Sequence, residues 1–250
     1  MYRIVEKRLL APEIYLMDIE APRIAKSANP GQFIIVMADE KGERIPLTIC
    51  DYDEDKGTVT IVFQTLGCST KKMAKYEVGD SFSDLVGPLG QPSDLLSGDI
   101  NDLKDMKILY VAGGVGTAPV YPQVKWLHNN GIKADVVVGT RTKDMLILED
   151  EMKDVAGELY ITTDDGSYGC SGMVTDKIND LIDNQGKKYD HVVAIGPMIM
   201  MKFVAKLTKE LGIPTTVSLN PIMVDGTGMC GACRVTVRDE VKFACVDGPE

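Results

Sequence analysis

Short apolar strands alternate with helical segments between residues 107 and 218, and this alternation constrains the fold more than any other feature of the chain. Helices are expected after the glycines at 113–116 as far as about Asn129, near 172–183 and near 197–211. The expected strands are 107–112, 134–138, 159–163, 191–195 and 215–218. Strand, helix and strand in succession form right-handed crossovers, which give a parallel sheet with helices on both faces. We therefore predict an α/β domain over residues 102–220.

Residues 1–101 follow a different pattern. Short strand-like runs at 32–37, 58–64 and 81–86 are separated by glycine and proline, and one helix is expected near 69–75. Such closely spaced short strands predict a small antiparallel barrel or sandwich. Glycine and cysteine dominate residues 221–250, which fit neither pattern. The predicted fold class is thus an antiparallel β-barrel or sandwich, a parallel-sheet α/β domain and a small C-terminal module.

Composition argues against several functional classes. Lysine and arginine total 27 and aspartate and glutamate total 37, so the net charge is 27 − 37 = −10. This balance argues against a nucleic-acid binder and against docking on an anionic membrane surface. No apolar run reaches the roughly 18 residues that would span a bilayer. The charged N-terminal stretch lacks the apolar core of a secretion signal, so a cytoplasmic location is expected.

A glycine-rich turn lies between the strand at 107–112 and the helix that follows it. Its pattern is G-x-G-x-x-P, and glycines there allow a close approach of backbone N–H groups to a dinucleotide's phosphates at a helix N-terminus. The alternative is an ordinary strand-to-helix turn. Further nucleotide contacts are expected at the carboxyl ends of later strands, where ligands of open α/β sheets bind. The candidate nucleotide-binding residues are Gly113, Gly114, Gly116, Thr117, Ala118, Pro119, Arg141, Asp164, Gly196 and Pro197.

A second candidate site lies in the β-rich half. The run Arg44-Ile45-Pro46-Leu47-Thr48 offers an arginine for a pyrophosphate and a hydroxyl for a flavin ring or ribityl chain. Gly67-Cys68-Ser69-Thr70 then offers N–H groups and hydroxyls at the start of the expected helix. A surface arginine and an ordinary helix cap are the alternative. The candidate flavin-binding residues are Arg44, Pro46, Leu47, Thr48, Gln64, Gly67, Ser69 and Thr70.

The C-terminal cysteines form the third candidate site. Asp225, Cys230, Cys233 and Cys245 have the spacing D-x4-C-x2-C-x11-C. Plant-type [2Fe–2S] sites use C-x4-C-x2-C and a distant fourth cysteine, so the spacing predicts such a cluster with Asp225 in the first place. A zinc site with three cysteines and one aspartate, three free thiols, and a turn role for Asp225 are the alternatives.

The order of these motifs resembles the ferredoxin-reductase superfamily, in which a barrel binds flavin and an α/β domain binds nicotinamide. With the C-terminal module included, the chain is similar to the electron-transfer subunit of bacterial dihydroorotate dehydrogenase. It is more similar still to the sulfide dehydrogenase β subunit and to the small subunit of NADH-dependent ferredoxin:NADP⁺ oxidoreductase, in which Asp takes the first ligand position. The strings M-x-D-G-T-G-M-C-G-A-C-R-V and F-A-C-V-D-G-P-E carry this similarity. One departure is Ile195, which precedes Gly196-Pro197 where many members of the superfamily have a cysteine.

The resemblance implies an oxidoreductase subunit that uses FAD on residues 1–101, NAD(H) on 102–220 and a [2Fe–2S] cluster on 221–250. Hydride transfer needs no general base, so His128 and His191 are expected to be structural or surface residues. The resemblance also implies a larger partner subunit with another flavin and more iron–sulfur clusters, through which ferredoxin and NADP(H) would exchange electrons by bifurcation. Two other functions remain open from the residues, a dihydroorotate dehydrogenase electron-transfer subunit and a zinc-stabilised nucleotide-binding regulator.

Overall fold

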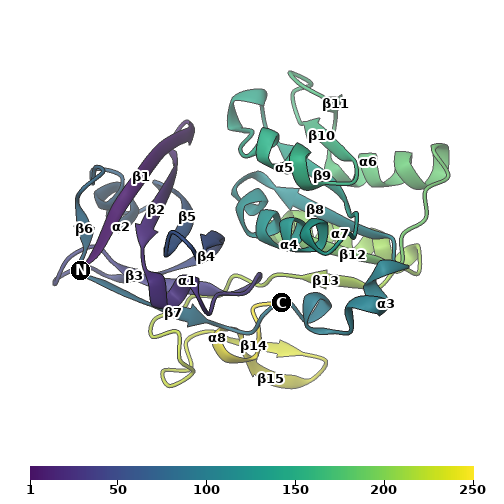
Figure 1. The fold of residues 1–250 in the computed structure, drawn as a ribbon. Helices are drawn as coiled ribbons and strands as arrows, with labels where there is room; N and C mark the ends of the chain where they lie inside the picture. The colour runs from purple at the N-terminus through teal and green to yellow at the C-terminus, as the bar shows by residue number, and fades with distance from the viewer. The chain divides into compact units, whose positions relative to one another are not determined.

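The computed structural model describes residues 1–250, apart from the side chain of Ser97. The chain forms two compact units, one made of Met1–Asp94 with Leu219–Glu250 and the other of Leu95–Ser218 (Figure 1). The C-terminal module is therefore part of the same unit as the barrel. The division into flavin, nicotinamide and cluster modules stays a prediction.

The first unit contains a seven-stranded antiparallel sheet in the order β6-β1-β2-β5-β4-β3-β7. Its edge strands β6 and β7 are joined in sequence through Ser83, whose backbone N–H donates to the carbonyls of Met37 and Ala38 at 3.2 and 3.3 Å. The sheet is thereby curled into a nearly closed barrel, as predicted. The strands are β1 (Tyr2–Ala11), β2 (Ile14–Glu20), β3 (Phe33–Met37), β4 (Arg44–Asp53), β5 (Thr58–Gln64), β6 (Ser81–Phe82) and β7 (Asp84–Leu89).

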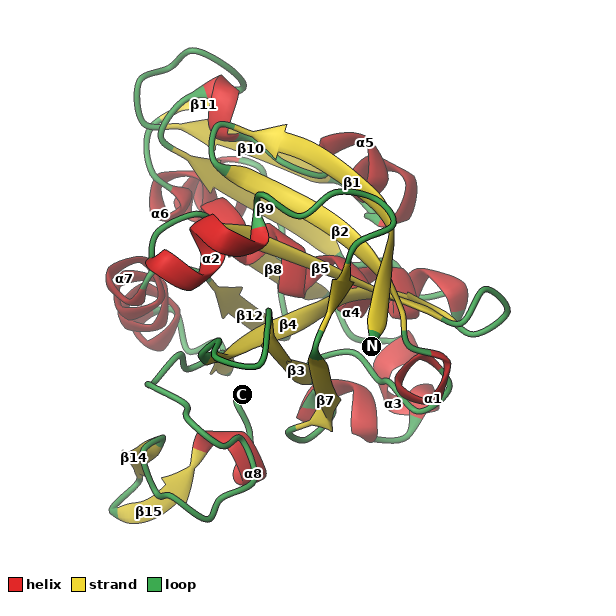
Figure 2. Cartoon of the chain, turned by 90° about the vertical axis from the view of Figure 1, so that its left-hand side faces the viewer, coloured by secondary structure: helices red, strands yellow, loops and turns green.

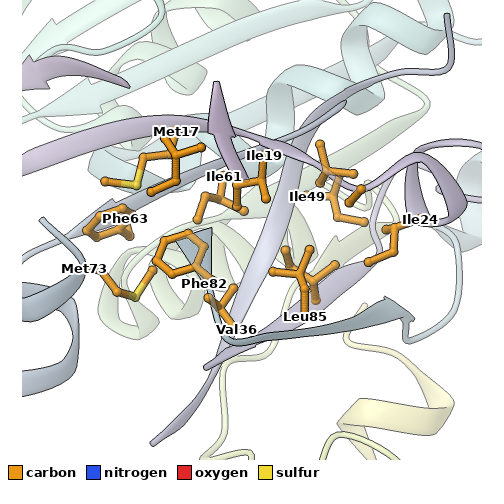
Figure 3. Packing of buried hydrophobic residues seen from close by; sticks show 14 of the residues in the cluster. Met17, Ile19, Ile24, Val36, Ile49, Ile61, Phe63, Met73, Phe82 and Leu85 are labelled. Atoms are coloured by element: carbon orange, nitrogen blue, oxygen red, sulfur yellow. The ribbon is translucent and has the colours of Figure 1, made fainter. Parts of the chain in front are cut away.

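Alternating side chains of these strands fill the barrel. Met17 and Ile19 of β2 meet Ile61 and Phe63 of β5 in the interior, and Phe82 of β6 is fully buried with them (Figure 3). Burial of each such side chain contributes about 1.5–3 kcal/mol. Two short helices lie beside the barrel, α1 (Pro22–Ala25) and α2 (Cys68–Met73).

The second unit contains a six-stranded parallel sheet in the order β11-β10-β9-β8-β12-β13. From β8 the chain first adds β9, β10 and β11 on one side of the sheet. It then returns to add β12 and β13 on the other side of β8, so the strand order reverses between β8 and β12. Ligands of open α/β sheets bind at such a reversal. The strands are β8 (Ile108–Gly113), β9 (Asp135–Thr140), β10 (Leu159–Thr163), β11 (Cys170–Ser171), β12 (His191–Ile195) and β13 (Thr215–Val217).

Helices cover both faces of this sheet, which confirms the predicted α/β architecture. Odd and even positions of β8 pack into different cores, since Tyr110 and Leu109 belong to separate hydrophobic clusters. The helices are α3 (Ile100–Lys104), α4 (Thr117–Asn129), α5 (Glu149–Val155), α6 (Val174–Asn179), which continues as a π-helical turn over Asp180–Asn184, and α7 (Met198–Glu210). No helix among the residues described above is both long and apolar enough to cross a membrane.

The C-terminal segment forms a hairpin of β14 (Arg234–Val237) and β15 (Glu240–Phe243), followed by helix α8 (Ala244–Asp247) (Figure 2). Arg238 and Asp239 connect the strands with left-handed backbones, φ 50° and 67°, which is the geometry of a tight two-residue hairpin turn. Cys233, Ala244 and Cys245 pack with Phe33 and Ile35 of β3 in one hydrophobic cluster. This cluster holds the segment on the barrel.

Candidate functional site

The glycine turn after β8 lies against the end of β12. A Cβ atom on Gly116 would come within 2.3 Å of the Ile195 carbonyl oxygen, and one on Gly113 within 2.8 Å of Pro197 Cδ. A Cβ on Gly114 would meet nothing within 4 Å, and its φ is +53°. Gly113 and Gly116 therefore permit close packing of the two strand ends, and Gly114 is the residue with space for a ligand.

The N-terminus of α4 completes this turn. Thr117 and Ala118 are buried, and the Thr117 hydroxyl donates to the Gly114 carbonyl at 2.9 Å. Their side chains therefore support the turn, while the backbone N–H groups at the first turn of α4 are left as candidate donors for an anion. This arrangement suits a pyrophosphate bound at the strand reversal between β8 and β12.

The ends of β9 and β10 lie next to each other on the same edge of the sheet. The backbone N–H groups of Asp164 and Asp165 donate to the carbonyls of Thr140 and Arg141 at 3.0 and 3.2 Å. Arg141 and Asp164 are both exposed, whereas the Asp165 carboxylate already accepts from the Ser167 hydroxyl at 2.6 Å. The structure thus brings the predicted Arg141 and Asp164 together at one rim of the candidate nucleotide site.

The candidate flavin residues lie where the barrel opens. The pairing of β4 with β5 runs from Asp53 opposite Thr58 to Ile49 opposite Ile61 and ends there. Arg44–Thr48 of β4 continue in pairs with β3 instead, and Gln64 lies at the far end of β5. The predicted residues of the two strands therefore line the two sides of this opening.

Two acidic side chains that the sequence analysis missed pair with the predicted flavin residues. Arg44 Nη1 lies 3.1 Å from Asp84 Oδ2 of β7, and both side chains are more than a third exposed. The Ser69 hydroxyl donates to the Glu43 carboxylate. The Gly67 N–H donates to the Thr70 hydroxyl at 3.1 Å, which caps α2. A phosphate bound here would replace the Asp84 carboxylate as the partner of Arg44 and the Glu43 carboxylate as the partner of Ser69.

A groove of about 480 Å³ runs along the start of β4. Besides Arg44 and Pro46 it is lined by Met223 and Val224, which directly precede Asp225. The predicted flavin strand and the start of the cysteine loop thus face one common hollow in the first unit. No local sequence pattern near residue 44 pointed to residues 223 and 224, because only the fold brings these distant segments together.

The cysteine loop is only partly arranged as a metal site. Cys233 and Cys245 are buried with their Sγ atoms 3.1 Å apart, whereas Cys230 is exposed. Asp225 accepts the backbone N–H groups of Thr227 and Cys230 at 2.7 and 2.8 Å. Among the side chains that the structure describes, no three His, Cys, Asp or Glu residues converge as a ready metal site.

The donor set nevertheless fits an iron–sulfur cluster in its chemistry. Two buried thiols are adjacent, a third thiol and a carboxylate lie on the same loop, and Gly226, Gly228 and Gly231 give that loop left-handed bends. The N–H of Thr227 and then that of Cys230 hold the pKa of the Asp225 carboxyl below its usual range. Burial, with the neighbouring Cys233, raises the pKa of the Cys245 thiol to about 11. A cluster would therefore need Cys230 and Asp225 to draw in toward the buried pair.

Two family models match the chain. Residues 220–250 match the iron-sulfur cluster binding domain of dihydroorotate dehydrogenase B, and residues 110–206 match the oxidoreductase NAD-binding domain. The first match favours the cluster over a zinc site. The second includes the glycine turn and the ends of β8, β9, β10 and β12.

Full-length relatives decide the family. A dihydroorotate dehydrogenase B (NAD⁺) electron transfer subunit homolog of Thermotoga maritima is 46% identical over 247 residues, which cover 99% of this chain and 84% of that protein. The electron transfer subunit of Fusobacterium nucleatum is 34% identical over 245 residues, which cover 96% of this chain and 91% of that protein. The chain belongs to this family.

Solved structures support this family membership. One described as the NADH-dependent reduced ferredoxin-NADP oxidoreductase, a flavin-based electron bifurcation system, matches with a TM-score of 0.90 and 45% identity. The match covers all of this chain and 87% of that one. An Amycolatopsis cytochrome P450 reductase shares the fold, with a TM-score of 0.69 and 15% identity over 86% of this chain and 68% of that one.

The predicted function is confirmed at the level of the family. The chain is an electron-transfer subunit of an oxidoreductase that uses an iron–sulfur cluster, NAD(H) and FAD. The assignment of individual residues to each cofactor stays a prediction. Members of the family are subunits of larger assemblies, as their description states.

Proposed function

We propose that the chain is the NAD(H)-side subunit of a flavin-based electron-bifurcating ferredoxin:NADP⁺ oxidoreductase in the cytoplasm. The observation that carries this proposal is the match of the whole chain to the NADH-dependent reduced ferredoxin-NADP oxidoreductase structure. Asp225 at the first ligand position supports it, since this replacement of cysteine is the feature by which the sequence resembles the bifurcating subunits.

The three candidate sites divide the task. The turn at Gly113–Pro119 and the strand ends at Arg141, Asp164 and Gly196 hold NAD(H). The opening between β4 and β5, with Arg44 and the Gly67–Thr70 cap, holds FAD, and the loop from Asp225 to Cys245 holds the cluster. Flavin is the carrier that links two-electron hydride chemistry to the one-electron chemistry of the cluster. The groove shared by Arg44, Pro46, Met223 and Val224 supports a flavin beside the cluster loop.

The partner in this proposal is a larger subunit that carries another flavin and further iron–sulfur clusters. Ferredoxin and NADP(H) would exchange electrons with that subunit and not directly with this chain. Co-purification of the chain from its native host tests the proposal. We expect a larger flavoprotein subunit and, in the purified complex, NAD⁺-dependent reduction of ferredoxin by NADPH.

A second candidate is the electron-transfer subunit of a dihydroorotate dehydrogenase, which the descriptions of several relatives favour. It predicts a different partner and NAD⁺ reduction driven by dihydroorotate. If the co-purified complex oxidised dihydroorotate and showed no NADPH-dependent ferredoxin reduction, the second candidate would replace the first.

A further inference from the structure

The string Asp247-Gly248-Pro249-Glu250, which follows the proposed ligand Cys245, is bonded to the barrel at several points. The backbone N–H of Gln91 donates to the Gly248 carbonyl at 2.8 Å, and the Gln91 side chain donates to the Val246 carbonyl at 2.8 Å. The buried Ser93 hydroxyl donates to the Glu250 carboxylate. Gln91 therefore holds the backbone at Gly248 and at Val246, just before the string, and Ser93 holds the side chain of Glu250 at its end.

These bonds lie where the chain passes between its two units. Gln91 and Ser93 come just before the crossing at Asp94, and Leu219 is the first residue of the first unit after the return. The Leu219 N–H donates to the Pro249 carbonyl at 2.9 Å. The string is thus bonded to the outgoing and to the returning segment of the chain.

The barrel is shaped to accept the string closely. A Cβ atom on Gly90 would lie 2.8 Å from the Gly248 carbonyl oxygen and 3.0 Å from the ring of Phe33, and Gly90 has a φ of +77°. The Gly90 carbonyl in turn accepts the side-chain amide of Gln32 at 3.0 Å. Only glycine fits at position 90, and the barrel therefore allows the Gly248 carbonyl to approach this closely.

At its N-terminal end the string overlaps helix α8, because Asp247 is the last residue of that helix, which also carries Cys245. Asp247 of the string accepts the N–H of Phe243, the residue that precedes α8, at 2.7 Å. The Cys245 N–H points at Cys233 Sγ at 3.5 Å. A displacement of the string would therefore displace Cys245 relative to Cys233.

We propose that Gln91 and Ser93 are positioning residues for the iron–sulfur cluster, which act by fixing the Asp247–Glu250 string and, through it, the Cys245 thiol. This proposal rests on the proposed ligand role of Cys245. Neither Gln91 nor Ser93 would be a ligand of the cluster. They fix the position of the Cys245 thiol relative to the barrel and to the groove at Arg44 and Met223. They do so just before the chain enters the nucleotide-binding unit, Leu95–Ser218.

The test measures the cluster itself in the full-length chain. Iron-replete Gln91→Ala, Ser93→Ala and the double variant are compared for the rate at which a chelator bleaches the visible absorption and for their visible circular dichroism. We expect bleaching about five- to thirtyfold faster in the double variant, the factor that corresponds to one or two kcal/mol. The circular dichroism should change, and FAD content should stay the same.

Matched variants separate positioning from general destabilisation. Gln185→Ala removes a side-chain hydrogen bond to Asp180 on the other unit and should bleach at the wild-type rate. Ser93→Thr keeps the hydroxyl and should restore most of the cluster's lifetime. If the double variant failed to fold, Gln91→Ala alone decides the test, because that side chain is exposed. Wild-type bleaching and dichroism in the folded double variant, or in that single variant, would overturn the proposal.

A Cys245→Ser variant separates the ligand role of Cys245 from the positioning role of Gln91 and Ser93. An intact cluster in Cys245→Ser would remove the ligand assignment on which the proposal stands. A cluster that is lost in Cys245→Ser but unchanged in the Gln91 and Ser93 variants would leave the ligand assignment in place and reject the positioning role.

Discussion

Gly114 and Gly116 belong to one turn yet have opposite surroundings. Sequence alone treats them alike, as glycines that make room for a pyrophosphate. In the structure only Gly114 faces open space, and Gly116 is pressed against the carbonyl of Ile195. The same substitution at each position should therefore have different consequences.

Gly114→Ala should weaken NADH binding by about tenfold or more, because its methyl group enters the ligand's space. The left-handed backbone at this position also adds roughly 1–3 kcal/mol of strain to the folded chain. Gly116→Ala should destabilise the nucleotide-binding unit by about 1–3 kcal/mol through overpacking. NADH titration and thermal unfolding measure the two effects. Wild-type NADH affinity in Gly114→Ala would contradict the site.

Arg44 and Asp84 offer a matched pair for the flavin site. Arg44→Ala should weaken FAD binding by about tenfold to a hundredfold, because a hydrogen bond to a charged group contributes about 1.5–3 kcal/mol. Asp84→Asn should leave FAD binding equal or tighter, because it frees the arginine, and the exposed pair itself contributes little to stability. Flavin retention through gel filtration checks both. Equal flavin loss in the two variants would assign Arg44 a structural role.

Asp225 has two separable roles, as proposed ligand and as acceptor for the N–H groups of Thr227 and Cys230. Asp225→Cys should still assemble a [2Fe–2S] cluster, with a shifted reduction potential and an altered electron paramagnetic resonance spectrum, because thiolate is a softer donor than carboxylate. Asp225→Ala should give a labile cluster, because it removes both the ligand and the loop contacts. Unchanged iron content, potential and spectrum in Asp225→Ala would rule out ligation.

Strands β5, β10 and β12 have the predicted bounds, because each is a compact run of β-branched and apolar residues between turn residues. The hairpin of β1 and β2 was missed. Only Ile4 and Ala11 of β1 are buried, and its charged outer face hides the strand pattern. The same limit applied to the site, where Gly67 and Arg44 were found from local motifs. Asp84 reaches the same site through the pairing of β7 with β3, and Met223 through the packing of the C-terminal segment on the barrel.

The pairing of β12 with β13 carries a pH-sensitive contact. His191 at the start of β12 lies 2.9 Å from the Thr216 hydroxyl of β13, and burial lowers its pKa. Below pH 6.5 the unfolded chain therefore binds a proton that the folded chain resists, so stability falls as the pH decreases. The loss amounts to about 1.4 kcal/mol per unit by which the pKa is lowered.

His191→Gln keeps a polar group near Thr216 but does not titrate. Its unfolding midpoint should therefore fall less than that of the wild type between pH 7 and pH 5, as measured by thermal melts in parallel buffers. Parallel pH profiles for the two proteins would show that His191 does not contribute.

Two compact units within one chain predict two separable responses to ligands. NADH at a hundredfold excess over its dissociation constant should stabilise the unit Leu95–Ser218 by about 2.7 kcal/mol. Removal of iron should lower the stability of the other unit, which holds the cysteine loop. Calorimetry should resolve two transitions that shift independently. A single transition that both treatments move would show that the units unfold together.

The barrel unit is interrupted in sequence by the entire nucleotide-binding unit, and this has a consequence for synthesis on the ribosome. Phe33 and Ile35 emerge early, but their partners Ala244 and Cys245 follow only after residues 95–218 have been translated. At roughly 5–20 residues per second this interval is on the order of ten seconds. During that time Phe33 and Ile35 of β3 lack these partners. The nascent chain is therefore most exposed to aggregation and to chaperones before its C-terminal segment has been synthesised.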